Sequence, residues 1–296
     1  MHPLVANWPA GVALACYAAV AGAHLTLVRR NGARLRDVIF VQAGLLTALL
    51  AIISPVGYWS GVYLWVRAIG DLMLTFVAPA LIVLGRPWLV LRQPKPAHTD
   101  TVLRAGGMPG PPGGGLVARE DLPEVETAWS RTAPVLAVAV FNLVWIGLQL
   151  PAAVDIVPGH PAARAAEEVC FLAAGLWFWL QLAGPARPGR WQTPLRRFAL
   201  LSVTVASGTV LGMVLVFGSS VVYPAYGNPG HHVLTVLDDQ QLSGAVLWMG
   251  MLPPLIIAGV ALLTAWLNHE ESGTPSDLGR LVSRPTWGWP ARPGPR

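Results

Sequence analysis

Charged residues are scarce in this chain. Asp, Glu, Lys and Arg account for 12% of its 296 residues, and hydrophobic residues account for 54%. A soluble domain carries about 25% charged residues, so this chain lacks the polar groups that an ordinary water-facing surface needs. The composition excludes a soluble globular domain and predicts a membrane protein.

Cysteine is almost absent too, as is histidine at membrane depth. The two cysteines, Cys16 and Cys170, form no CxxC pair, and we expect them as buried free thiols in apolar spans. His24 is the only histidine in an apolar stretch, which excludes a haem held by two histidines within the membrane. No phosphate loop, catalytic triad or zinc-binding helix is present. We therefore expect a protein that is not an enzyme.

Long apolar runs dominate what is present. A helix needs about 20 apolar residues to cross a hydrocarbon core of about 30 Å. Two of the candidate stretches look short, and we expect their helices to begin upstream, at Arg67 and Arg164. The sequence predicts an all-α membrane protein with seven transmembrane helices, at roughly 8–28, 38–58, 69–84, 133–154, 169–183, 198–218 and 242–267.

The basic residues predict the orientation of these helices. Of the 20 Lys and Arg residues, all but Arg67 and Arg164 fall in the segments 29–37, 85–132 and 184–197 or in the tail after 267. Basic loops stay in the cytoplasm, so we expect the N-terminus outside and the C-terminus inside a bacterial plasma (inner) membrane. The formal net charge of +5 then lies at the inner face, where it suits anionic membrane lipid; a nucleic-acid partner is not expected.

Two segments interrupt the membrane domain. Residues 86–132 contain "RAGGMPGPPGGG", a composition that cannot bury a core, and residues 268–296 are similar. We therefore expect helices one to three within 1–85, a disordered Gly/Pro-rich cytoplasmic loop at 86–132, helices four to seven within 133–267, and a disordered cytoplasmic tail at 268–296.

Polar residues gather near the expected outer ends of the helices. Arg67 with Asp71, and Arg164 with Glu168, are four residues apart and share a helix face. These residues form either structural ion pairs or a functional site built from both pairs, since charges within a membrane are usually paired or functional. The expected outer-face polar cluster comprises Arg67, Asp71, Gln149, Asp155, Arg164, Glu167, Glu168, Asp239, Gln240 and Gln241.

Six segments, in order along the chain, resemble the CtaG-type cytochrome c oxidase assembly factors of bacteria. "ISP" lies at the end of the second span, "VAPALIVLGRP" ends the third, and "LQLPAAVD" ends the fourth. "EEVCFLAAGLWFW" lies in the fifth span, and "YPAY" and "DDQQLSGAVLW" lead into the seventh. The segment from Asp239 to Gly244 is the most specific of these. The resemblance implies an integral membrane factor that helps to mature a haem-copper oxidase in the respiratory chain, with oxidase subunits as partners.

The resemblance also implies a ligand set that this chain lacks. The family usually has histidine pairs at the starts of the third and fifth helices and another histidine in the fourth, a set suited to copper. Those positions correspond here to Arg67 and Asp71, to Arg164 and Glu168, and to Gln149. Copper is therefore the only cofactor in question, with its usual ligand positions substituted by ion pairs.

Three functional interpretations stay open. The first is oxidase assembly with copper handling at the outer face, the second is a metal-free structural partner or chaperone, and the third is a transporter or channel subunit. His160, His231 and His232 are weak candidates for metal ligands, because all three lie in segments expected outside. Tyr223 and Tyr226 are expected at the outer membrane interface.

Overall fold

Helices form all the regular structure of the described residues. The computed structural model describes residues 8–91, 128–158, 160–184, 194–227 and 233–282. The all-α prediction is confirmed for these ranges. The elements are α1 (Trp8–Asn31), α2 (Leu35–Ile53), α3 (Pro55–Trp59), α4 (Leu64–Leu72), the π-helix η1 (Met73–Val77), α5 (Ala78–Leu84), α6 (Pro87–Leu91), α8 (Ala128–Gly147), α9 (Pro151–Val154), α10 (Pro161–Ala183), α11 (Pro194–Phe217), the 3₁₀-helix η2 (Pro224–Tyr226) and α12 (Val236–Val282).

Six helical stretches are long and apolar enough to cross a membrane, which makes this a multi-pass membrane protein. They are Gly11–Asn31, Leu35–Trp59, Leu64–Val90, Pro161–Ala183, Pro194–Phe217 and Val236–Asn268. The expected crossing at 133–154 is a shorter apolar helix, Thr132–Gly147. It ends early because Leu150 precedes Pro151 and is extended, with ψ near 144°, so the chain turns before α9 begins. The third and fifth spans begin upstream of the apolar runs, as expected.

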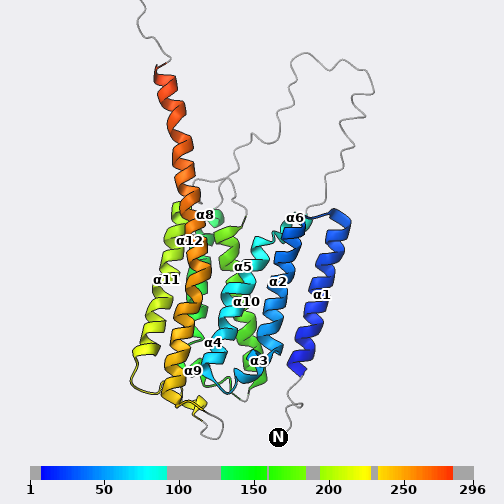
Figure 1. Cartoon of the computed structure of the whole chain (residues 1–296), viewed down its shortest axis with the longest axis vertical. Coiled ribbons are helices and arrows are strands. Elements are labelled where there is room, and N and C mark those ends of the chain that lie inside the picture. Colours follow the sequence, from blue (N-terminus) through cyan, green and yellow to red (C-terminus); the bar gives the residue numbers. More distant parts are fainter. Residues whose placement is uncertain (1–7, 92–127, 159, 185–193, 228–232, 283–296) are drawn as a thin grey trace, which may run out of the picture.

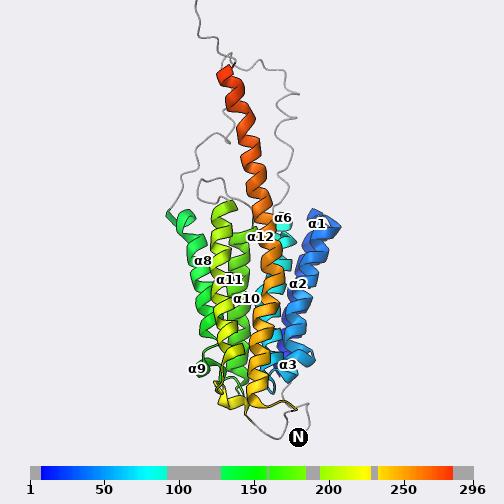
Figure 2. The ribbon, with the colours of Figure 1, turned by 60° about the vertical axis from the view of Figure 1, so that its left-hand side comes forward.

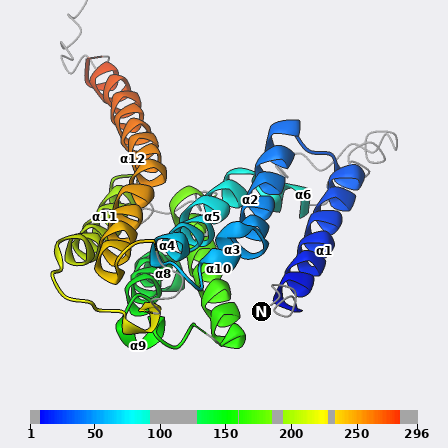
Figure 3. The ribbon, with the colours of Figure 1, turned by 60° about the horizontal axis from the view of Figure 1, so that its bottom comes forward.

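The helices stand side by side in one bundle (Figures 1 and 2). Helix α10 packs against α8 and α5, α12 packs against α11 and α4, and α2 packs against α5. Figure 3 shows α1 at one edge beside α2, and α11 and α12 at the opposite edge. We call the end that carries α3 and α9 the α9 end, at the bottom of Figure 1, and the other the α6 end.

The third span changes helical type in its middle. Pro79 has no N–H and cannot donate to the carbonyl of Thr75, so α-helical pairing fails there. The amide of Ala78 instead donates to the carbonyl of Met73, five residues earlier, as in a π-helix. A side chain on Gly175 of α10 would clash with the Thr75 carbonyl and with Pro79. The widened turn therefore packs directly against a glycine of α10.

Aromatic side chains fill the centre of the bundle. Phe76 packs edge-on against Phe141 and Trp145, with ring centroids 5.4 and 5.1 Å apart. Phe141 stacks on Phe178 at 4.4 Å, and Trp145 meets Phe171 at 5.9 Å. All five rings are buried. They form a buried aromatic layer in the middle of the helices.

Three expectations about segments and thiols need correction. Helix α12 continues to Val282, so residues 268–282 are helical although their composition predicted disorder; extending an existing helix avoids the free-energy penalty of nucleation. Residues 87–91 and 128–132, assigned to the disordered loop, belong to α6 and α8. Residues 92–127 and 283–296 lie outside the described residues, so disorder there stays a prediction. Cys16 and Cys170 are exposed rather than buried.

Candidate functional site

An ionic network lies inside the bundle near the α9 end. Its centre is Arg67 of α4, which is only 1% exposed. One nitrogen, Nη2, donates to the Glu167 carboxylate of α10 and to the carbonyl of Leu148, the latter at 3.2 Å. Its Nε lies 3.8 Å from the Asp71 carboxylate, close enough for charge attraction. Arg67 therefore ties α4 to α10 and to the turn after α8.

Arg164 of α10 completes the network. Its Nε donates to Glu168 at 2.8 Å and its Nη1 to Glu167 at 3.0 Å. The same Nη1 lies 3.6 Å from Asp71 Oδ1. Gln149 Nε2 donates to Asp71 Oδ2 at 3.1 Å. Each of the three carboxylates therefore has at least one guanidinium as a neighbour.

The structure changes one of the two predicted pairings. Arg164 and Glu168 form the expected bridge along one helix. Arg67 and Asp71 are within ion-pair distance, but the hydrogen bond of Arg67 goes across to Glu167. The sequence analysis placed Glu167 in the cluster without identifying this partner. Its one local signal was the spacing of three residues from Arg164, which also puts it on the face that α10 turns toward α4.

Asp239 of α12 caps the beginning of α4. Its two carboxylate oxygens accept from the backbone amides of Leu64 and Trp65, at 2.9 and 3.1 Å. The residue before the helix, Tyr63, provides no side-chain cap of its own. A carboxylate at a helix N-terminus satisfies unpaired amides and complements the helix dipole. Asp239 thereby fixes the turn that carries Arg67.

The two glutamines after Asp239 hold the chain that leaves α11. Gln240 accepts from the amide of Val222 at 2.7 Å and donates to the carbonyl of Ser220 at 3.1 Å. Gln241 donates to the carbonyl of Gly218 at 3.1 Å. The Asp-Gln-Gln segment therefore positions backbone on two sides, α4 and the 218–222 segment.

Two tyrosines of the following loop close the network. Tyr223 donates to the carbonyl of Gln149 at 2.8 Å, and Tyr226 donates to the carbonyl of Ser60 at 3.3 Å. Both are 2% exposed, so the expectation that they mark a membrane interface is wrong. Burial raises the pKa of each phenol to about 12, which keeps both as hydrogen-bond donors. Asp155 accepts from the amide of Ala225 at 3.3 Å and joins this loop to α9.

The residues at this site do not fit a copper ion. A guanidinium has no free electron pair for a metal, and Arg67 and Arg164 occupy the carboxylates around them. In the part of the chain that the structure describes, no group of three or more His, Cys, Asp or Glu is arranged to hold a metal. His160 is exposed, with Nδ1 2.9 Å from the Ile156 carbonyl. His231 and His232 lie outside the described residues.

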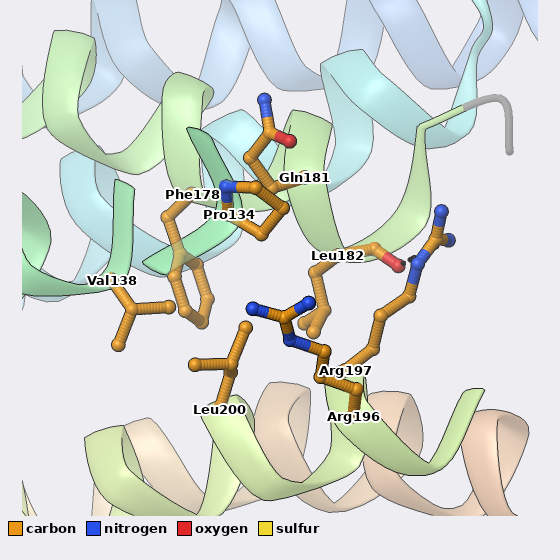
Figure 4. A pocket seen from close by; sticks show the side chains of 8 residues that line it. All are labelled: Pro134, Val138, Phe178, Gln181, Leu182, Arg196, Arg197 and Leu200. Carbon is orange, nitrogen blue, oxygen red and sulfur yellow. Dashed lines mark hydrogen bonds between the residues drawn. The ribbon is translucent and has the colours of Figure 1, made fainter. Parts of the chain in front are cut away.

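At the α6 end a small hollow lies between α8, α10 and α11. Figure 4 shows it between Pro134, Phe178 and Leu200. Its volume is only about 10 Å³, room for one water. Arg197 beside it donates to the carbonyl of Leu182 at 3.1 Å, near the end of α10. This arginine supports a helix end. The elaborate polar site is the one at the α9 end.

A family model described as cytochrome c oxidase caa3 assembly factor (Caa3_CtaG) matches residues 16–269. The chain belongs to this family. The match includes the resembling segments and the entire ionic network, and it confirms the resemblance found in the sequence. The family is described as one of assembly factors for the caa3-type oxidase. No curated protein and no solved structure matches the chain.

Proposed function

We propose that this caa3 assembly-factor family member binds an oxidase subunit at its α9 end, and that its ionic network holds the binding surface in shape without a metal. The network is the observation that supports this. Arginines and carboxylates stand where the sequence resemblance expects histidines, and they form ion pairs across α4 and α10. The protein then acts as a membrane chaperone and not as an enzyme.

The surface of the α9 end, next to the network, has the character of a binding site. Ile156 and Val221 are apolar and exposed at this end. The segments that carry them are joined by the hydrogen bond from Ala225 to Asp155. Exposed apolar side chains on an internally braced surface suit a protein partner. We place this surface outside a bacterial plasma membrane, with seven crossings that include α8.

The alternative functions have less support. Copper handling needs free ligands, which the network does not offer. A transporter or channel subunit needs a polar path through its core. Here the aromatic layer of Phe76, Phe141 and Trp145 fills the middle of the bundle, on the side of the network away from the α9 end.

Affinity purification of the tagged full chain from native membranes tests the proposal. We expect oxidase subunits to co-purify with the wild type and to be lost from Ile156→Asp and Val221→Asp. Leu195→Asp is the matched control, because Leu195 is equally exposed at the α6 end. Co-purification that is absent from the wild type, or unchanged in both surface variants, contradicts the proposal. A stoichiometric copper ion that disappears in Asp71→Asn supports copper handling instead.

A further inference from the structure

A cavity of about 310 Å³ lies between α1, α2, η1 and α10. Its volume is at the lower end of the range for ligand sites in proteins. The walls are mainly apolar, with Val12 and Val20 on α1, Leu45 and Leu49 on α2, and Leu172 on α10. Helix α1 is the most loosely held of the candidate spans, with 11% of its most apolar window buried. The cavity therefore sits under a peripheral helix, beside the surrounding lipid.

One charged side chain lines this apolar cavity. It is Glu168, whose carboxylate also accepts from Arg164 at 2.8 Å. Glu168 is seven residues into α10, about 10 Å from its beginning at the rise of an α-helix. That depth is near the boundary between the headgroup and hydrocarbon layers of a bilayer. A molecule in the cavity can thus have a chain in the apolar part and a polar group beside Glu168.

The charge balance selects the sign of that polar group. Three carboxylates, Asp71, Glu167 and Glu168, face two guanidiniums in the network. With all five groups ionised, one negative charge is left over, and Glu168 is the network carboxylate at the cavity wall. A cationic group there restores neutrality, while an anionic headgroup is repelled.

We propose that the cavity binds one amine-headed membrane phospholipid, with an acyl chain along the apolar walls and the ammonium group at Glu168. The lipid fills the space between α1 and α10. It also couples the position of α1 to the ionic network through Glu168. This inference is independent of the proposed oxidase partner.

Native mass spectrometry of the purified full chain tests the lipid site, with phosphatidylethanolamine and phosphatidylglycerol as the probes. We expect the wild type to retain one phosphatidylethanolamine and to prefer it over phosphatidylglycerol by about tenfold, the size expected for one charged hydrogen bond. Ala13→Trp places a large side chain in the cavity and should abolish retention. Ala15→Trp is the matched control, because Ala15 is exposed on α1 but does not line the cavity.

Glu168→Gln distinguishes the contribution of the headgroup to binding from that of the acyl chain. This change keeps the shape of the side chain but removes its charge, so the two phospholipids should bind nearly equally. Ala13→Trp should still lower the retention of both. The melting temperature should rise with phosphatidylethanolamine in the wild type and not in Ala13→Trp. Equal retention of both phospholipids by the wild type overturns the ammonium contact. Retention by Ala13→Trp equal to that of Ala15→Trp overturns the cavity as the site.

Discussion

Arg67 shows what a buried charge does at the scale of one residue. Its side chain is almost fully enclosed, and it contacts Glu167, Asp71 and the carbonyl of Leu148. Removing one partner of such a pair leaves an uncompensated buried charge, whereas replacing both by apolar residues is often nearly neutral. Arg67 and Glu167 should therefore depend on each other more strongly than either depends on the remaining residues.

A double-mutant cycle measures this dependence. Arg67→Leu or Glu167→Leu alone should lower the free energy of unfolding by about 3 kcal/mol, because each removes the hydrogen-bonded partner of a buried charge. The double variant should lose less than the sum of the two. Thermal unfolding of the purified protein in detergent provides the readout.

The cycle for Arg67 and Asp71 is the control. These side chains are 3.8 Å apart and no hydrogen bond joins them, so their coupling should be smaller. Additive effects for Arg67 and Glu167, or a larger coupling to Asp71, would show that the contact across the helices is not the important one.

At the scale of elements, the start of α4 depends on a residue from the other end of the sequence. Asp239→Ala removes the acceptor for two amides and should lower stability by about 1–2 kcal/mol, the usual effect of losing a helix cap. It should also increase hydrogen exchange at the amides of Leu64 and Trp65. Differential scanning calorimetry measures the loss of stability, and exchange mass spectrometry measures the exchange.

Asp238→Ala is the matched control for the cap. Asp238 is the neighbouring acid, but it is exposed and accepts from the hydroxyl of Thr235 at 2.5 Å. Its loss should leave exchange at the start of α4 unchanged. Equal hydrogen exchange at the start of α4 in the two variants would contradict the capping role of Asp239.

The elements also show which parts of the fold and site the sequence could predict. Apolar length predicted the spans, and the spacing of four residues predicted the bridge between Arg164 and Glu168, since both are local properties. The bond from Arg67 to Glu167 joins residues 100 positions apart and depends on how α4 and α10 are rotated. The cap from Asp239 and the burial of Tyr223 and Tyr226 depend on tertiary packing in the same way.

The π-turn and the last helix show that even the structure of a single segment is only partly predictable from its own sequence. Pro79 interrupts α-helical pairing in the third span, but the widened turn at Met73–Val77 also needs Gly175 on the facing helix. The Gly- and Pro-containing tail suggested disorder after 267, yet α12 continues to Val282. Composition describes the average tendency of a segment, while its structure also depends on what it is attached to.

At the scale of the whole molecule, the two ends differ in chemistry. The basic residues other than Arg67 and Arg164 fall in alternate connecting segments and the tail, and the ionic network lies at the opposite end. From the positive-inside rule we expect the α9 end outside. This assignment depends on whether α8 (Ala128–Gly147, 20 residues) crosses the membrane, because the apolar part described for it, Thr132–Gly147, is shorter than the six other candidate spans.

Reporter insertions on both sides of α8 test this directly. Alkaline phosphatase, active only outside the plasma membrane, should work between residues 156 and 159 and fail between residues 105 and 115. The same contrast around α11 is the control, with activity at 228–232 and none at 185–193, because α11 is a full-length candidate span. If α8 does not cross, the reporter will give the same result at both α8 positions. The α9 and α6 ends of the bundle would then not face opposite sides of the membrane, and the network could not be assigned to the outer side.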